Sequence, residues 1–201
     1  MTDAVSPTMT APVIHQHRLE SARQVASPNF NTRPDGCEPD LLVLHSISLP
    51  PGEFGGPAIE QLFTNCLAAD GHPYFLGIHQ LRVSAHLLVR RDGSLVQFVP
   101  FDLRAWHAGQ SAYEGRENCN DFSIGIELEG TDTDPFEMAQ YNSLAQVIRS
   151  LLNTYPSLSR RRITGHSDIA PGRKTDPGTG FDWALLNRLL DRLSDGTELT
   201  P

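Results

Sequence analysis

A short, unbroken apolar run, Leu41-Leu42-Val43-Leu44, limits most strongly what this chain can fold into. Apolar residues at successive positions, without alternation, predict a strand that is buried on both faces. Strand-like and helix-like segments alternate along the rest of the chain. The sequence therefore predicts one α/β domain with a central mixed sheet flanked by helices.

Local patterns predict the elements around this strand. Residues 122–130 alternate apolar and polar side chains, which is typical of a strand, and Asp92-Gly93 between two apolar runs predicts a hairpin. Helical periodicity predicts three helices, over residues 57–67, 134–155 and 181–193. The second should begin with Asp134 as its N-cap, Pro135 at N1 and Glu137 at N3.

The chain has 201 residues, enough for one domain with a substantial core. We expect this domain to span residues 15–193, between flexible tails at 1–14 and 194–201. The polar start shows no signal peptide, and no apolar stretch approaches the length of a membrane span. Three cysteines at wide spacings, without a CxxC motif, suit a reducing compartment, so we expect a cytoplasmic protein.

The formal net charge of -8 argues against a nucleic-acid-binding protein, because no overall positive field would draw the chain to phosphates. We expect neither nucleic acid nor a membrane as a partner. Arg160–Arg162, Arg173 and Lys174 still form a local basic cluster, which leaves an anionic substrate open. The arginine run also fits a solvated helix end.

The loop from Thr164 to Gly178 carries the strongest sign of a site. Its His166 and Asp176 offer a nitrogen and a hard oxygen, both of which Zn²⁺ accepts as ligands. Lys174 places a cation two residues before Asp176. The alternative is a surface turn with one structural histidine, and a third ligand elsewhere would favour the metal site.

His45, at the C-terminal end of the apolar strand, could be that ligand or a hydrogen-bonded core residue. Two histidines and one carboxylate leave a position open for water, as catalytic zinc sites do. Glu127 lies on the polar face of the strand 122–130, so it could take a proton from that water; the alternative is an ordinary solvent-facing glutamate. Lys174 could face the oxyanion of a tetrahedral intermediate.

Several long motifs, in order, make the chain similar to the amidase-2 family of zinc-dependent N-acetylmuramoyl-L-alanine amidases. They are LVLHSISLPPGEF at 42–54, VSAH at 83–86, RAWHAG at 104–109, NDFSIGIELEGT at 120–131 and the loop 164–178. The resemblance runs from about residue 15 to about residue 193 and is strongest to the cytoplasmic members that act on 1,6-anhydro-muropeptides. It implies the family's mixed sheet flanked by helices.

The resemblance also implies roles for five residues. His45, His166 and Asp176 would bind Zn²⁺, Glu127 would be the general base, and Lys174 would stabilise the transition state. The reaction would cleave the amide between the lactyl group of 1,6-anhydro-N-acetylmuramic acid and L-alanine, in peptidoglycan recycling. In bacteria with inducible β-lactamase, such an enzyme would also lower the pool of inducing muropeptides.

Weaker candidates for substrate contact are Ser46, Arg82, Trp106 and His107. Core packing explains Trp106 equally well. Ser46 stands where the family commonly has asparagine, and both residues can hydrogen-bond a substrate. Asn118 stands where the family is expected to have arginine, which puts one contact to the peptide carboxylates in doubt.

Two alternatives differ in function. A non-catalytic muropeptide-binding module on the same fold would usually lack one metal ligand, whereas the ligand set is complete here. An amidase acting on intact peptidoglycan would need an export or lipoprotein signal, and residues 1–19 supply neither. The anhydro-muropeptide enzyme is therefore the favoured interpretation, and we expect it to be a monomer.

Overall fold

The computed structural model describes residues 12–194, so most of the two predicted tails, 1–11 and 195–201, lie outside the described residues. At the start of the described chain, β1 (Ile14–His15) pairs antiparallel with β2 (Arg18–Leu19). The Ser150 hydroxyl donates a hydrogen bond to the carbonyl of Pro12, which ties this segment to a long helix.

Within residues 12–194, a six-stranded sheet forms the centre of the molecule. Its strands lie in the order β12 (Ile163–Gly165), β5 (Leu41–Ile47), β11 (Ser123–Glu129), β6 (Leu87–Val89), β7 (Leu95–Gln97) and β3 (Arg23–Gln24). The first four strands run parallel, β7 runs antiparallel to β6, and β3 pairs parallel with β7. This confirms the predicted mixed sheet and the hairpin between β6 and β7.

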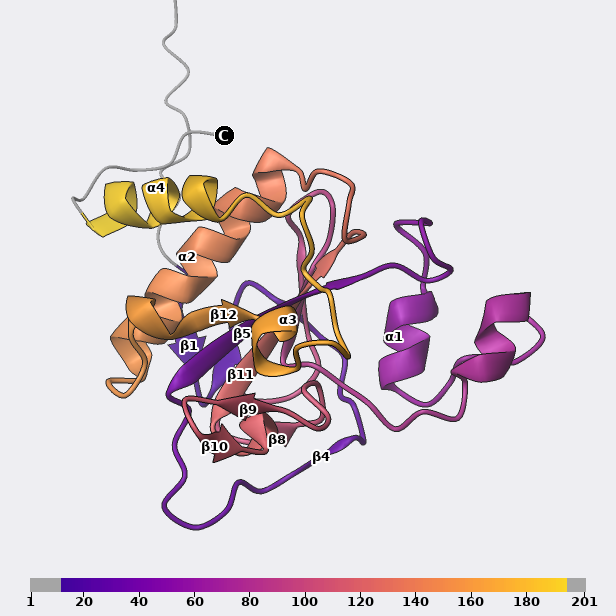
Figure 1. The fold of residues 1–201 in the computed structure, drawn as a ribbon, viewed down its shortest axis with the longest axis horizontal. Coiled ribbons are helices and arrows are strands. Elements are labelled where there is room, and N and C mark those ends of the chain that lie inside the picture. The colour runs from indigo at the N-terminus through magenta and orange to yellow at the C-terminus, as the bar shows by residue number, and fades with distance from the viewer. Residues whose placement is uncertain (1–11, 195–201) are drawn as a thin grey trace, which may run out of the picture.

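Two helices, α2 (Met138–Thr154) and α4 (Trp183–Ser194), pack together over one face of the sheet (Figure 1). They share an apolar core with Leu42 and Leu44 of β5. The short helix α1 (Ala58–Phe63) covers part of the other face, over a second core that includes Leu88. Residues 41–44 are completely buried, which confirms the strand predicted from the apolar run.

Short elements complete the described chain. Two strand pairs are β4 (Phe30–Asn31) with β8 (Arg104–Ala105), and β9 (Ala112–Tyr113) with β10 (Arg116–Glu117). Single helical turns are η1 (Pro73–Gly77), η2 (Cys119–Asp121), η3 (Arg160–Arg162) and α3 (His166–Ile169). Among the described helices, none combines the length and the apolar character needed to cross a membrane.

The predicted helix over 57–67 is too long. α1 ends at Phe63, because Asn65 adopts a left-handed backbone conformation with φ of 62° that a helix cannot continue through. Cys66 therefore lies beyond the helix and is exposed.

The predicted start of the second helix is also wrong. Asp134 is not the N-cap, since its own N–H donates to the hydroxyl oxygen of Thr131 at 3.0 Å within a loop. The helix begins at Met138, after Glu137 as N-cap, and the side-chain oxygen of Gln140 accepts the N–H of Glu137 at 3.0 Å. The predicted end near residue 155 is confirmed.

Candidate active site

Three parallel strands bring the candidate residues into one row across the sheet. His45 of β5 is in register with Glu127 of β11, and Leu44 of β5 is in register with Gly165, the last residue of β12. The next residue after β12 is His166, at the start of α3. Residues in register on parallel strands point to the same face, so the row lies on the face opposite α2 and α4.

The three predicted metal ligands converge. Nδ1 of His45 lies 2.9 Å from Nδ1 of His166 and 3.1 Å from Oδ2 of Asp176, and the last two atoms are 3.0 Å apart. His45 is 1% and His166 3% exposed, and the side chain of Asp176 is 14% exposed. The N–H of Ser167, in α3, donates to the carbonyl of Asp176 at 2.9 Å, and this bond holds Asp176 next to α3.

This set of donor atoms fits a metal cation. Nε2 of His166 lies 3.1 Å from the carbonyl oxygen of Ala108, which can only accept, so a neutral ring would carry its proton on Nε2. Its Nδ1 then directs a lone pair toward Oδ2 of Asp176, with no ring proton between them. Two such acceptors repel each other unless a cation lies with them, and Zn²⁺ accepts both ligand types.

The protonation states also suit metal binding. Burial lowers the pKa of His45 to about 4, so the ring is neutral near pH 7. Neutral imidazoles and an ionised carboxylate are the forms in which these groups bind metals.

Glu127 is not the solvent-facing glutamate of the alternative interpretation, because it is only 8% exposed. Its Oε2 is buried and has no hydrogen-bond partner among the described residues. Burial raises its pKa well above the usual range, the charge of Asp176 raises it further, and Lys174 lowers it. A buried, unpaired carboxylate beside a candidate metal cluster is suited to accept a proton.

All five principal candidates border one cleft of about 300 Å³. The loop between α3 and Asp176 carries the exposed Lys174, whose backbone N–H donates to the carbonyl of Ala170 at 3.0 Å. Polar and charged residues of the cleft include His45, Ser46, His107, Glu127, His166, Lys174 and Asp176. Apolar residues include Leu49, Tyr74, Ile78, Leu81 and Trp106.

Two of the weaker candidates line this cleft with their polar atoms engaged. The Ser46 hydroxyl donates to Oδ1 of Asp132 at 2.9 Å. The indole N–H of Trp106 donates to Oδ1 of Asn31 at 2.7 Å, so the ring is held at the cleft wall and is only partly buried. These bonds fix both side chains before any substrate arrives.

The other two weaker candidates differ in position. Arg82 is exposed and donates to the carbonyl of Gln80 at 3.2 Å, and the structure does not bring it into the cleft lining. His107 lines the cleft, but its Nδ1 lies 2.9 Å from Nε2 of His45, behind the candidate ligand.

Sequence reasoning missed Asp132. Its carboxylate accepts from the hydroxyls of Ser46 and Thr175, which directly follow His45 and precede Asp176 in the chain. Asp132 thus links the two segments that carry candidate ligands. No pattern around it indicated this, because its partners are distant in sequence.

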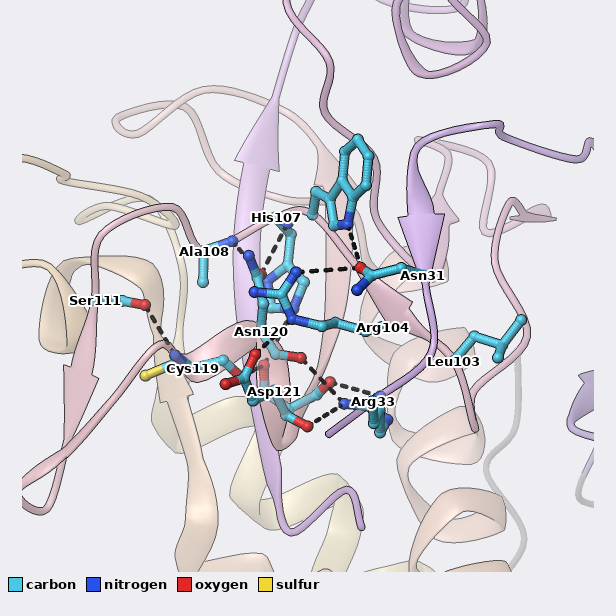
Figure 2. Close-up of polar contacts among 12 residues, drawn as sticks. Asn31, Arg33, Leu103, Arg104, His107, Ala108, Ser111, Cys119, Asn120 and Asp121 are labelled. Carbon is cyan, nitrogen blue, oxygen red and sulfur yellow. Dashed lines mark hydrogen bonds and ion pairs between the residues drawn. The ribbon is translucent and has the colours of Figure 1, made fainter. Parts of the chain in front are cut away.

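Sequence reasoning also missed the part that Asn120 takes in the structure. Its Oδ1 accepts the N–H groups of His107 at 3.1 Å and of Ala108 at 2.8 Å (Figure 2). Arg33 in turn donates to the carbonyls of Asn120 and Asp121, at 3.1 and 3.0 Å. Asn120 belongs to a motif recognised in the sequence, but the motif did not indicate what the side chain binds.

The fold and the cleft define a class of protein, the metal-dependent hydrolases. The α/β domain places a His-His-Asp cluster that could hold a metal ion beside a buried carboxylate. Residues 35–179 match the family described as N-acetylmuramoyl-L-alanine amidase. The chain belongs to the N-acetylmuramoyl-L-alanine amidase family.

Similar proteins share this fold. The 1,6-anhydro-N-acetylmuramyl-L-alanine amidase AmpD of Citrobacter freundii is 60% identical over 172 residues, which are 86% of this chain and 91% of that protein. A crystal structure of a selenomethionine derivative of AmpD is 58% identical with a TM-score of 0.87, over 89% of this chain and 99% of the other. AmpDh3 from Pseudomonas aeruginosa, in complex with anhydromuramic pentapeptide, is 30% identical with a TM-score of 0.59, over 79% and 62% of the two chains.

Next to the site, His86 is a hydrogen-bonded core residue. Its Nδ1 accepts the N–H of Gly125 and its Nε2 lies against the carbonyl of Leu103, both at 3.0 Å. Burial, together with the charge of Arg33, lowers the pKa of His86 to about 3. The ring is therefore kept neutral over most of the acidic range.

We expect acid to destabilise the fold through His86. An unfolded histidine binds a proton below about pH 6.5, whereas the folded ring does so only near pH 3, so this stability is complete above pH 6.5 and is lost as the pH falls. When the pH falls from 7 to 5, the unfolding free energy of wild type should decrease by about 2 kcal/mol more than that of His86→Gln. Urea titrations in a chelator measure this, and equal losses would contradict it.

Proposed function

We propose that this protein is a zinc-dependent amidase that hydrolyses the amide between the lactyl group of 1,6-anhydro-N-acetylmuramic acid and L-alanine in muropeptides. His45, His166 and Asp176 would hold the Zn²⁺. One observation carries the proposal: two ring nitrogens and a carboxylate oxygen meet within 2.9–3.1 Å beside the unpaired carboxylate of Glu127. Membership of an amidase family supports it.

Each catalytic residue has a defined task in this proposal. When bound, Zn²⁺ supplies Lewis acidity that polarises the scissile carbonyl and lowers the pKa of the attacking water. Glu127 accepts a proton from that water, and its raised pKa makes it a stronger base than an exposed glutamate. Glu127 then delivers the proton to the leaving nitrogen of L-alanine. Lys174 faces the oxyanion and stabilises its charge.

The substrate proposal draws on similar proteins. The Citrobacter freundii relative is named as an amidase of the 1,6-anhydro sugar, and the Pseudomonas aeruginosa neighbour was solved with an anhydromuramic pentapeptide. We assign contacts with the substrate to Ser46, Trp106 and His107, which line the cleft. Arg82 would contact it at the rim, because both of its chain neighbours line the cleft and its side chain is exposed.

The same proposal places the enzyme in peptidoglycan recycling. A cytoplasmic location, a monomeric state, the lack of nucleic-acid and membrane partners, and an influence on β-lactamase induction stay predictions, as does a catalytic domain spanning residues 15–193. A non-catalytic binding module would need neither the complete ligand set nor a buried unpaired Glu127, so the enzyme is favoured.

The decisive experiment compares substrates. We expect the zinc-loaded protein to release the free stem peptide from anhydro-muropeptides, identified by mass spectrometry, with a kcat/KM well above that for intact peptidoglycan. A pocket shaped to the bicyclic sugar would discriminate in this way, since an unpaired buried polar group alone can lower kcat/KM by about 10⁴-fold. Comparable values for both substrates would overturn the assigned specificity, and binding without any cleavage would favour the binding module.

A further inference from the structure

A chain of polar contacts runs from the backbone of η2 to the rear nitrogen of His45. The Ser123 hydroxyl donates to the carbonyl of Cys119 at 2.6 Å, and its oxygen lies 3.1 Å from Nε2 of His107. Nδ1 of His107 then lies 2.9 Å from Nε2 of His45. Of the residues in this series of contacts, His45 alone belongs to the proposed ligand set.

The hydrogens along this chain can be counted. A serine hydroxyl has one hydrogen, and Ser123 uses it on a carbonyl that can only accept. Its oxygen therefore accepts from His107. In its neutral form the ring of His107 has one proton, which must lie on Nε2.

The position of the proton on His107 also determines the position of the proton on His45. With its proton on Nε2, His107 offers only a lone pair at Nδ1, which must accept the proton of Nε2 of His45. The neutral ring of His45 then keeps a lone pair on Nδ1, the atom 2.9 Å from Nδ1 of His166. A backbone carbonyl thus determines, through two side chains, which nitrogen of His45 is free to bind a metal.

We propose that His107 is a positioning residue that sets the tautomer and the orientation of His45 and so raises the affinity of the site for zinc. The inference rests on the proposed zinc site. It means that consecutive residues support both ligand histidines, since the carbonyl of Ala108 accepts from Nε2 of His166. Groups that bond the distal nitrogen of a ligand histidine fix its tautomer and ring direction.

The surroundings hold His107 in place. Gly125 of β11 lies under its ring, where a Cβ would come within 2.4 Å of Cγ of His107, so only glycine leaves room. Asn120 accepts the backbone N–H groups of His107 and Ala108, which anchors the segment at its base (Figure 2). His107 was also predicted from the sequence to contact the substrate; its two ring nitrogens face His45 and Ser123.

Zinc affinity gives the first test, with two variants of the full chain compared by competition against a chromogenic chelator. His107→Leu removes the acceptor and should weaken zinc binding by about 10- to 100-fold. His107→Asn keeps a side-chain oxygen near the position of Nδ1 and should recover much of that loss. Wild-type affinity in His107→Leu, or equal losses in both variants, would overturn the proposal.

Nitrogen-15 NMR of the imidazole rings gives a second test that needs neither zinc nor a variant. In the metal-free wild-type chain, His45 and His166 should both carry their proton on Nε2, and the ring of His107 should do the same. A proton on Nδ1 of His45 would sink the assignment even if a variant failed to fold. Should the predicted tautomers be found in a chain that binds no zinc, the proposed function would fail while the contact chain stood.

Discussion

Replacing Glu127 with glutamine should lower kcat at least about 100-fold while the protein keeps its fold and its zinc. The amide side chain has nearly the same shape but cannot accept the proton of the attacking water or return it to the leaving nitrogen. Steady-state kinetics on anhydro-muropeptides, with zinc content measured on the same sample, test this. Loss of zinc from the variant would instead make Glu127 a ligand or the support of one.

Glu129→Gln is a matched control for that variant. Glu129 lies two residues further along β11, on the same face, and is also buried, but it accepts from Arg90 at 2.8 Å and from the N–H of Gly55 at 2.7 Å. Its substitution should lower the unfolding free energy and leave kcat close to wild type. A fall in kcat as large as that of Glu127→Gln would show that general loss of charge from the strand, rather than base catalysis, explains the effect.

Lys174→Met extends the same test to the oxyanion. The substitution retains an apolar stem of similar length but removes the ammonium, so a loss of roughly 3 kcal/mol of transition-state stabilisation, or about 100-fold in kcat, is expected with zinc content unchanged. Retained kcat would remove Lys174 from the mechanism.

Removing the metal should abolish activity, and added Zn²⁺ should restore it. The site offers three ligand atoms within hydrogen-bonding distance of one another and leaves an open position for the reacting groups, so catalysis and binding should rise together during a zinc titration. Zinc should also stabilise the fold, by about 2.7 kcal/mol at a free concentration one hundred times its Kd. Full activity after verified removal of the metal would rule out the proposed mechanism.

Single-ligand variants refine that result. Asp176→Ala should lose both zinc and activity, because it removes one of the three converging atoms. His79→Ala is its control, since His79 lies outside the cluster and its ring contacts the carbonyl of Phe75 at 3.1 Å. Both should be assayed for bound zinc after identical dialysis. Equal zinc contents would show that Asp176 is not a ligand.

Local sequence was enough to predict the buried strand, the hairpin and most of each long helix, because these depend on the spacing of apolar residues and on turn residues within one segment. The ligands and the two catalytic candidates could also be named, since each stands at the end of a strand or in a motif of distinctive residues. Local sequence misplaced the start of α2. Asp134, the predicted N-cap, lies in a loop where its N–H donates to the hydroxyl oxygen of Thr131, and the helix begins after Glu137.

What surrounds those residues was decided by the tertiary structure. The register of β12, β5 and β11 brings His45, Glu127 and His166 into one row, and no local pattern contains that register. The contact of His107 with His45 joins residues 62 positions apart along the chain, and that of Asp132 with Ser46 joins residues 86 positions apart. Such bonds form only when packing brings both groups together, so the residue types that can bind zinc were readable from the sequence, whereas the tautomer and orientation in which they are held depend on the folded chain.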